Sequence, residues 1–205
     1  MNENSMIPIS DEQAKLGQEI VGAGRDLGRY ATDILGDIPK DLVGILVGDK
    51  VKVRRAERLA ELWQKAQKRL REQGVTEPES PGLNLALPIL VAAADENREE
   101  LQDLWARLLT ASMNPNRSKL VRLGFAGALQ KLDPLDARTL VWMRQHGGSA
   151  EGGNRNTMAI ELECIRDEVD VSLKNLVKVD FVFELNTGMT ALTAFGREFL
   201  RTVLD

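Results

Sequence analysis

The two residue types that most often act in catalysis or bind zinc each occur once in this chain of 205 residues, as Cys164 and His146. A zinc site needs several cysteine or histidine ligands, so these two residues do not predict one. Cys164 lies between Ile160 and Ile165 on a predicted helix, which favours a buried and unreactive thiol. His146 stands before two glycines at a predicted helix end, without an obvious serine or cysteine partner, so we expect a helix-capping or surface histidine.

Carboxylates form a cluster whose helical spacing could bring several acidic groups together: Glu96, Glu99, Glu100 and Asp103. No histidine joins them, and acidic residues in the first turns of a helix are stabilised by the positive end of its dipole. We therefore expect helix-end electrostatics and no metal site. The sequence has no GxSxG, phosphate-loop or HExxH motif, so we predict no catalytic residue, no cofactor, no small-molecule substrate and no enzymatic activity.

Basic residues could instead bind an anionic partner. They alternate with Glu57 and Glu61 along a helix predicted over residues 49–73, and Glu61 stands four residues before a lysine, a favourable spacing for an ion pair. The sequence therefore favours a solvated, salt-bridged face; the alternative is a face for phosphate groups or lipid headgroups. The basic residues of this face are Lys50, Arg54, Arg58, Lys65 and Arg69.

Composition indicates a globular protein, because 43% of the residues are hydrophobic and 28% are charged. The length allows one or two domains. A net charge of -4 and a pI near 5.3 argue against binding nucleic acid over the whole surface. No signal peptide is evident, and the apolar runs at residues 42–47 and 85–94 are shorter than the roughly 20 residues of a spanning helix. Together with the single cysteine, these features predict a cytoplasmic protein.

Residues 1–48 are predicted to form a glycine-rich helical leader. Apolar residues between positions 11 and 36 recur at helical spacing, but glycines interrupt them and weaken the helix. Glycine loops joining short helices are the first interpretation. The alternative is close helix packing within the protein, between subunits or on a membrane surface, because small residues four apart let two helices approach closely. The glycines with this spacing are Gly24, Gly28, Gly44 and Gly48.

Residues 49–132 are predicted to form a helical body. Trp63 and Trp105 within it, and Trp142 beyond it, are expected to anchor the core. The predicted elements of the body are a helix over 49–73 that ends at Gly74, a proline-rich linker over 75–83, a helix over 84–94, a helix capped by Asp95 that runs to Met113, and a helix over 120–132.

Residues 133–205 are predicted to form a winged-helix-like domain, so the fold class is mainly α with a small α+β unit at the C-terminus. Asn186, Thr187 and Gly188 have the turn chemistry of a short β-hairpin. The predicted elements are a helix that begins at Asp133 and Pro134, a loop over 149–156, helices over 158–167 and 171–179 with Asp170 capping the second, strands over 181–185 and 189–192, and a last helix capped by Thr193.

A winged helix suggests DNA binding, in which one helix enters the major groove. The candidate recognition helix offers Lys174, Asn175 and Lys178 but no arginine. Nearby carboxylates would repel phosphate, so nucleic acid is the less favoured partner and a protein-interaction module is favoured. These carboxylates are Glu161, Glu163, Asp167, Glu168, Asp170 and Asp180.

Two parts of the sequence carry a family resemblance. The first is GDKVKVRRAERLAELWQKAQKRLREQGV at residues 48–75 with LALPILVAAADENREELQDLWARLLTASMNPN at 85–116, and the second is LDPLDARTL at 132–140 with ALTAFGREFL at 191–200. Over residues 45–204 the chain resembles the Abi-alpha family of bacterial proteins, with ELQDLWARLL as the most specific match. The resemblance implies a role in abortive infection, in which a phage-infected cell is sacrificed or growth-arrested, and it implies no catalytic residues.

Three functional hypotheses result. The first is a phage-defence protein that senses or binds another protein, either a different partner or further copies of itself. The second is a membrane-active effector whose glycine-rich leader and basic helix meet the inner membrane, which would place the protein at the periphery of that membrane. The third is a winged-helix regulator that binds DNA.

Overall fold

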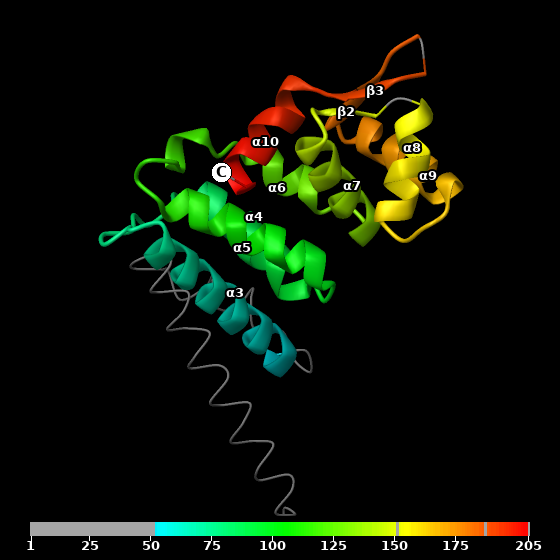
Figure 1. Cartoon of the computed structure of the whole chain (residues 1–205). Coiled ribbons are helices and arrows are strands. Elements are labelled where there is room, and N and C mark those ends of the chain that lie inside the picture. The colour runs from blue at the N-terminus through cyan, green and yellow to red at the C-terminus, as the bar shows by residue number, and fades with distance from the viewer. Residues whose placement is uncertain (1–51, 151, 187, 205) are drawn as a thin grey trace, which may run out of the picture.

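A computed structural model describes residues 52–150, 152–186 and 188–204 (Figure 1). The predictions for the leader, including Gly24, Gly28, Gly44 and Gly48, lie outside the described residues, as does Lys50. Within the described residues the chain is mainly helical, with a small antiparallel sheet near its C-terminus. The elements run in the order α3 (Lys52–Glu72), α4 (Leu83–Asp95), α5 (Glu99–Met113), the 3₁₀ turn η1 (Ser118–Leu120), α6 (Leu123–Leu129), α7 (Pro134–Gln145), β1 (Ser149–Ala150), α8 (Gly152–Glu161), α9 (Arg166–Lys178), β2 (Val182–Glu184), β3 (Thr190–Leu192) and α10 (Ala194–Leu204).

Helix α3 forms because its apolar residues recur three and four positions apart and pack against α4 and α5. Its buried apolar residues are Leu59, Leu62, Trp63, Ala66 and Leu70. Gly74 ends the helix in the left-handed conformation, with a φ of 71°. The N–H of Val75 then donates to the carbonyl of Leu70 at 2.9 Å, which satisfies a carbonyl at the helix end. The predicted helix and its glycine terminator are confirmed.

The boundary between α4 and α5 differs from the prediction. Asp95 is the last residue of α4 and does not cap α5, which begins at Glu99. Instead, the Glu96 carboxylate accepts hydrogen bonds from the backbone N–H groups of Asn97 and Arg98, at 3.0 and 2.9 Å. Asp95 is held away from this role because Arg55 of α3 binds both of its carboxylate oxygens, at 2.6 and 2.9 Å.

The helix predicted over residues 120–132 is divided into η1 and α6, which are separated by two extended residues, Val121 and Arg122. The start of α7 is as predicted. Pro134 occupies its first turn, and the Asp136 carboxylate accepts the backbone N–H of Asp133 at 2.8 Å within a capping box.

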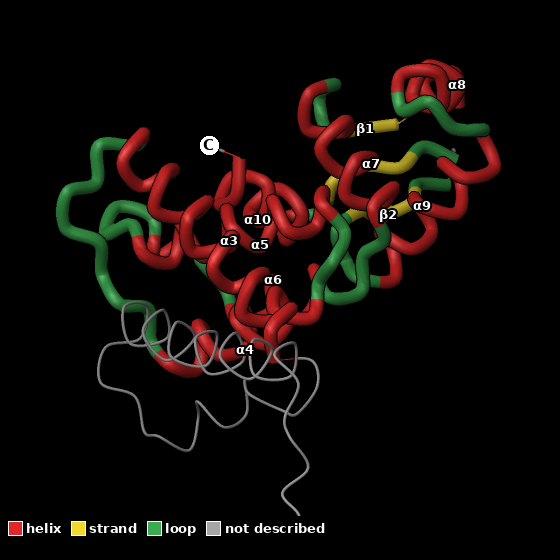
Figure 2. The backbone as a smooth tube through the Cα atoms, turned by 90° about the horizontal axis from the view of Figure 1, so that it is seen from below, coloured by secondary structure: helices red, strands yellow, loops and turns green. Residues whose placement is uncertain are grey.

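The three strands all lie in the C-terminal unit, defined as residues 134–204, and away from α3 and α4 (Figure 2). Strand β3 is central: β2 pairs with it antiparallel through Phe183 opposite Ala191, and β1 pairs through Ser149 opposite the same residue. The predicted hairpin is therefore confirmed. The predicted loop over 149–156 is wrong, because pairing with β3 turns its first two residues into β1 and α8 already begins at Gly152.

The turn between α8 and α9 also lies earlier than predicted. Helix α8 ends at Glu161, and Glu163 adopts a left-handed φ of 53°. The carboxylate of Glu168 accepts the backbone N–H of Ile165 at 2.9 Å, so α9 begins four residues before the predicted cap, Asp170. Asp170 lies within the helix, and Arg155 of α8 donates to its carboxylate at 2.8 Å.

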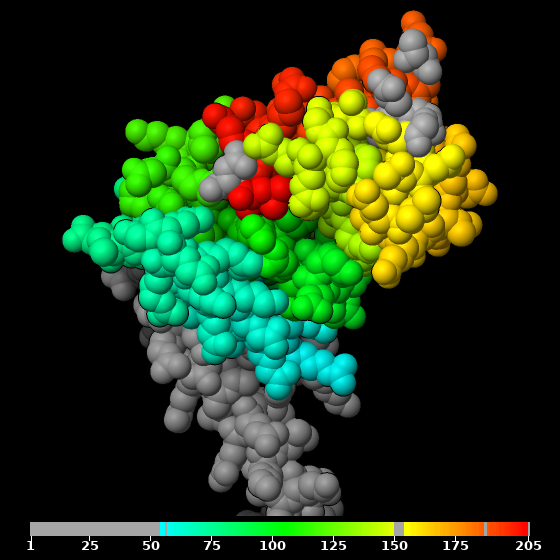
Figure 3. Space-filling view, viewed as in Figure 1, coloured from blue at the N-terminus to red at the C-terminus, as the bar shows by residue number. Residues whose placement is uncertain are grey.

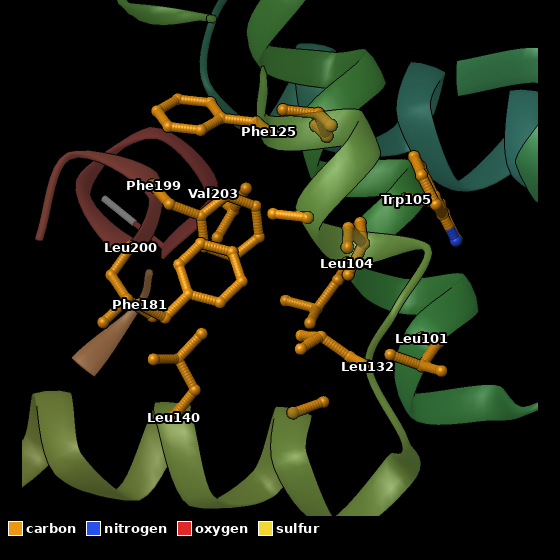
Figure 4. Close-up of a cluster of buried hydrophobic side chains, with 14 of the residues drawn as sticks. Leu101, Leu104, Trp105, Phe125, Leu132, Leu140, Phe181, Phe199, Leu200 and Val203 are labelled. Carbon is orange, nitrogen blue, oxygen red and sulfur yellow. The ribbon is translucent and has the colours of Figure 1, made fainter. Parts of the chain in front are cut away.

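One continuous hydrophobic core joins the body, here residues 52–132, to the C-terminal unit. Phe199 of α10 and Phe181 lie beside Phe125 of the body and Leu140 of α7 (Figure 4). Trp63, Trp105 and Trp142 are all buried, which confirms them as core residues. Helix α10 packs on α5, and Arg117 of the body donates to the carbonyl of Thr202 near the end of α10 at 2.9 Å.

Candidate interaction site

The predicted basic face of α3 divides into residues that bind neighbouring helices and residues that face solvent. Arg58 donates to the carbonyl of Ala94 at 3.1 Å, and Arg69 forms an ion pair with Asp103 of α5. Lys65 is half-buried, and Arg54 is exposed. Two of the four described members of this face therefore fix α3 to α4 and α5, and binding of an anionic partner stays a prediction.

Asp103 of α5 binds two arginines, Arg69 of α3 and Arg107 of its own helix. Its carboxylate accepts the Nε–H of Arg107 at 2.6 Å on one oxygen and a guanidinium N–H of Arg69 on the other. Burial raises the pKa of Asp103, but the hydrogen bonds and positive charges of Arg107 and Arg69 more than offset it, so the pKa lies below its ordinary value. The ionised carboxylate therefore stabilises the junction of α3 and α5.

Replacing this carboxylate is expected to change how stability depends on pH. A lowered folded-state pKa gives stability that is present above the unfolded-state pKa and lost as the pH falls through the folded-state pKa. At neutral pH, Asp103→Asn is expected to lower the free energy of unfolding by about 1 kcal/mol, a small value because the pair is partly solvent-screened. The difference in the free energy of unfolding between Asp103→Asn and wild type should narrow as the pH falls from about 5 to about 2.

Urea unfolding at several pH values measures this difference. Glu57→Gln, which removes an exposed carboxylate from α3 on the other side of the junction, is the matched control and should be nearly neutral. If Asp103→Asn lowers the free energy of unfolding by the same amount at every pH, a role for the ionised carboxylate would be contradicted.

The other members of the predicted acidic cluster have separate surroundings. Glu96 binds Arg98 at 2.8 Å. Burial raises the pKa of Glu96, but the hydrogen bonds and positive charge of Arg98 more than offset this, so the pKa lies below its ordinary value. Glu99 and Glu100 are exposed in the first turn of α5, where the helix dipole favours them. Within the described ranges, no group of three or more histidine, cysteine or acidic side chains is arranged to hold a metal ion.

His146 caps the C-terminal end of α7 and is exposed, as predicted. Its ring stacks on that of Trp142, with centroids 3.8 Å apart, and its Nδ1 lies 3.0 Å from the Trp142 carbonyl oxygen. Its Nε2 lies 3.5 Å from the carboxylate of Glu161, which also accepts the indole N–H of Trp142 at 2.6 Å. The sequence did not indicate Glu161 as a partner, because it lies on a different helix.

The surroundings of Cys164 differ from those expected. The thiol is half-buried, and Ile160 and Ile165 on either side are 76% and 64% exposed rather than part of the core. Burial raises the pKa of Cys164, and the nearby charge of Glu168 raises it further. The protonated thiol is thus favoured, which agrees with the predicted low reactivity.

The predicted recognition residues all lie on α9, but they do not share one role. Lys174 and Lys178 are exposed, whereas Asn175 is directed towards α7. The side-chain amide of Asn175 donates to the Asp136 carboxylate and to the carbonyl of Lys131, the latter at 3.3 Å. Asn175 therefore helps to hold α9 in place, and DNA binding through the two lysines stays a prediction.

A groove of about 480 Å³ lies where α5 of the body meets α7 and α8 of the C-terminal unit. Figure 3 shows the body, in cyan and green, meeting the C-terminal unit, in yellow to red. Apolar residues such as Leu104, Val141 and Leu162 line the groove, with Arg107 and Arg138 among its polar residues. Arg107 binds Asp103 within α5 and also donates to the carbonyl of Val203 of α10 at 3.4 Å. Arg138 of α7 donates to the carbonyl of Leu162 just after α8, so both arginines link elements of the fold.

The exposed apolar residues distinguish the C-terminal unit from the body. Among the described residues, Leu83 and Leu123 are the large apolar side chains of the body that are exposed. The C-terminal unit carries a larger set on α8, on α9 and the residue before it, and on β2, and exposed apolar side chains gathered in one part of a protein can mark a site of interaction. This set is Ile160, Ile165, Val171, Val177 and Phe183.

Within the part of the chain that the structure describes, no helix is both long enough and apolar enough to cross a membrane.

Neither the curated proteins nor the solved structures contain a match to this chain. The family model described as abortive infection alpha matches residues 54–187, well over half of the chain. The match covers α3 to α9 and β2, and therefore both the body and the exposed apolar residues of the C-terminal unit. The chain thus belongs to the abortive infection alpha family.

Proposed function

We propose that this chain acts in abortive infection of phage-infected bacteria as a non-enzymatic protein that binds another protein. Membership of the abortive infection alpha family supports the link to phage defence. The observation that carries the binding role is the set of exposed apolar side chains on α8, α9 and β2, because the rest of the described surface exposes few side chains of this kind. A cytoplasmic location, with or without contact to the inner membrane, is part of the proposal.

The C-terminal unit would be the binding module. Its order of α7, β1, α8, α9, β2 and β3 supports a winged-helix-like assignment, with the β2–β3 hairpin as the wing and α9 as the recognition helix. The outward side of α9 carries Asp167 and Val171 together with Lys174 and Lys178. This mixture of charge and apolar surface suits a protein partner better than a phosphate backbone.

A plaque assay tests the proposal. Cells that express the wild-type chain should yield fewer plaques from a sensitive phage than cells without it. The double variant I160S/I165S removes two exposed apolar side chains, so it should fold normally but lose most of this protection. Leu123→Ser, which makes the same change at an exposed site on the body, is the matched control and should protect like wild type.

The alternatives give different outcomes in the same assay. A DNA-binding regulator would lose protection in K174E/K178E and would bind DNA in a salt-sensitive manner, whereas a protein-binding module would keep protection in that variant. A membrane-active effector would bind anionic liposomes and would lose protection when residues 1–48 are deleted. Full protection by I160S/I165S, with the variant confirmed as folded by circular dichroism, would contradict the proposed binding role.

A further inference from the structure

Backbone hydrogen bonds and a buried side chain fix the turn between α8 and α9. The N–H groups of Leu162 and Cys164 donate to the carbonyls of Met158 and Ala159, at 2.8 and 2.9 Å, and close the end of α8. The side chain of Leu162 is buried. The turn lies at the end of the C-terminal unit away from the β2–β3 hairpin (Figure 1). It therefore presents a fixed surface to solvent.

Three apolar side chains mark this surface. Ile160 is in the last turn of α8, Ile165 directly precedes α9, and Val171 lies on the outward side of α9. They are 76%, 64% and 67% exposed, so they contribute little to the core of the chain itself. Covering them with an apolar surface of a partner would remove them from water, which favours association.

The charge around these side chains is predominantly negative. Glu163, Asp167 and Glu168 are exposed between and beside the apolar residues, whereas the basic residues nearby are Arg166 and, one turn beyond Val171, Lys174. Arg166 lies 3.9 Å from Asp170, which partly neutralises it. We name this surface the α8–α9 corner; its residues are Ile160, Glu163, Ile165, Asp167, Glu168 and Val171.

Apolar residues interleaved with carboxylates complement a helix that has apolar residues on one side and lysine or arginine beside them. An anionic membrane or a nucleic acid would instead be repelled. We propose that the α8–α9 corner docks a basic amphipathic helix of the protein partner. This inference rests on the proposed function and specifies the chemistry of its partner.

Cys164 offers a direct reporter of docking, because it is the only cysteine of the chain and lies in the turn between Ile160 and Ile165. Cys164 is half-buried and packs against the core, so we expect its thiol to react slowly but measurably with a small reagent. A helix docked on the corner should cover the thiol and slow its reaction with a thiol-specific dye such as DTNB.

The test uses the full-length chain and a fluorescent helical peptide of leucine and lysine, about 18 residues or five turns long. Fluorescence anisotropy should show binding to this peptide and at least tenfold weaker binding to a matched peptide of leucine and glutamate. I160S/I165S should weaken binding of the basic peptide at least tenfold, and added salt should weaken it further. The basic peptide should also slow the reaction of Cys164.

Charge variants separate the corner from general attraction to an acidic protein. E163Q/D167N removes two carboxylates from the corner and should weaken binding several-fold. E99Q/E100Q removes two exposed carboxylates from α5 and should leave the affinity unchanged. Equal effects of the two pairs, or equal affinity for both peptides, would overturn the inference.

Failure of this inference can be told from failure of the proposed function. If I160S/I165S abolishes plaque protection but the basic peptide does not bind, the corner is functional and the proposed partner chemistry is wrong. If the peptide binds as expected but I160S/I165S still protects fully, the proposed function fails. Concentration-dependent sedimentation that is abolished by I160S/I165S would identify a second copy of the chain as the occupant and overturn the inference.

Discussion

Gly196→Ala is expected to destabilise the protein by about 3 kcal/mol, because a methyl group at this position would overlap the backbone of a neighbouring segment. A Cβ atom at Gly196 would lie 2.1 Å from the carbonyl oxygen of Phe181 and 3.0 Å from its carbonyl carbon. Both are backbone atoms, so no side-chain rotation can relieve the overlap. Gly196 therefore lets the first turn of α10 lie directly against the chain that enters β2.

Local hydrogen bonds leave little freedom for this backbone to move. The N–H of Thr193 donates to the Phe181 carbonyl at 3.0 Å, and the Thr193 hydroxyl accepts the N–H of Gly196 at 2.9 Å. Accommodating a methyl group would break the cap of α10 or shift β2. Either change would disturb the core around Phe181, which is fully buried.

Chemical unfolding followed by circular dichroism measures the effect. Gly127→Ala is the matched control, since Gly127 is exposed within α6 and a Cβ atom there would meet nothing within 4 Å. That control should be stabilised by about 0.5–1 kcal/mol, because alanine favours a helix more than glycine does. A Gly196→Ala variant as stable as wild type would show that α10 and β2 are not packed as closely as described.

Phe199→Ala is expected to cost about 3–5 kcal/mol, the range found for removing a large buried aromatic side chain. The Phe199 side chain is fully buried, and its ring lies 5.4 Å from that of Phe125 and 4.8 Å from that of Phe181, measured between centroids. Phe125 belongs to the body, so this aromatic cluster connects the body to the C-terminal unit (Figure 4). Loss of the Phe199 ring should therefore destabilise the body and the C-terminal unit together.

Unfolding monitored at the same time by tryptophan fluorescence and circular dichroism checks this expectation. The wild type and the variant should each unfold in one transition, with the variant at lower denaturant. Phe183→Ala removes the same side chain from an exposed position in β2 and should cost far less. Two separate transitions, with only one of them shifted by Phe199→Ala, would contradict a shared core.

Several elements of the fold could be predicted because their signals are local. The apolar spacing of α3 and the glycine at its end, the proline and aspartate at the start of α7, and the turn residues of the β2–β3 hairpin each act within a few neighbouring residues. Thr193 likewise caps α10 through a hydrogen bond to Gly196, three residues away. Such signals do not require the rest of the chain to be placed.

The candidate site was less predictable for the opposite reason. Ile160 and Ile165 were expected on one helix beside a buried cysteine, yet they are exposed. Helix α8 ends at Glu161, so Cys164 and Ile165 lie in the turn before α9 and not on a helix that continues to residue 167. Arg69 was predicted on a solvated, salt-bridged face, with an anionic partner as the alternative, and it forms an ion pair with Asp103 of a different helix. Partners more than 30 positions apart in the chain leave no periodic pattern in the sequence.

The sequence by itself thus determined the helical class, most of the buried stripes, the hairpin and the family, because each depends on residue types at short, regular spacing. Only the tertiary structure decided that Ser149 and Ala150 form a strand, that Glu96 rather than Asp95 binds the backbone before α5, and which apolar and charged side chains remain on the surface. The physical reason is that strand pairing, ion pairs and burial depend on residues brought together from distant parts of the chain, and these contacts override local preference.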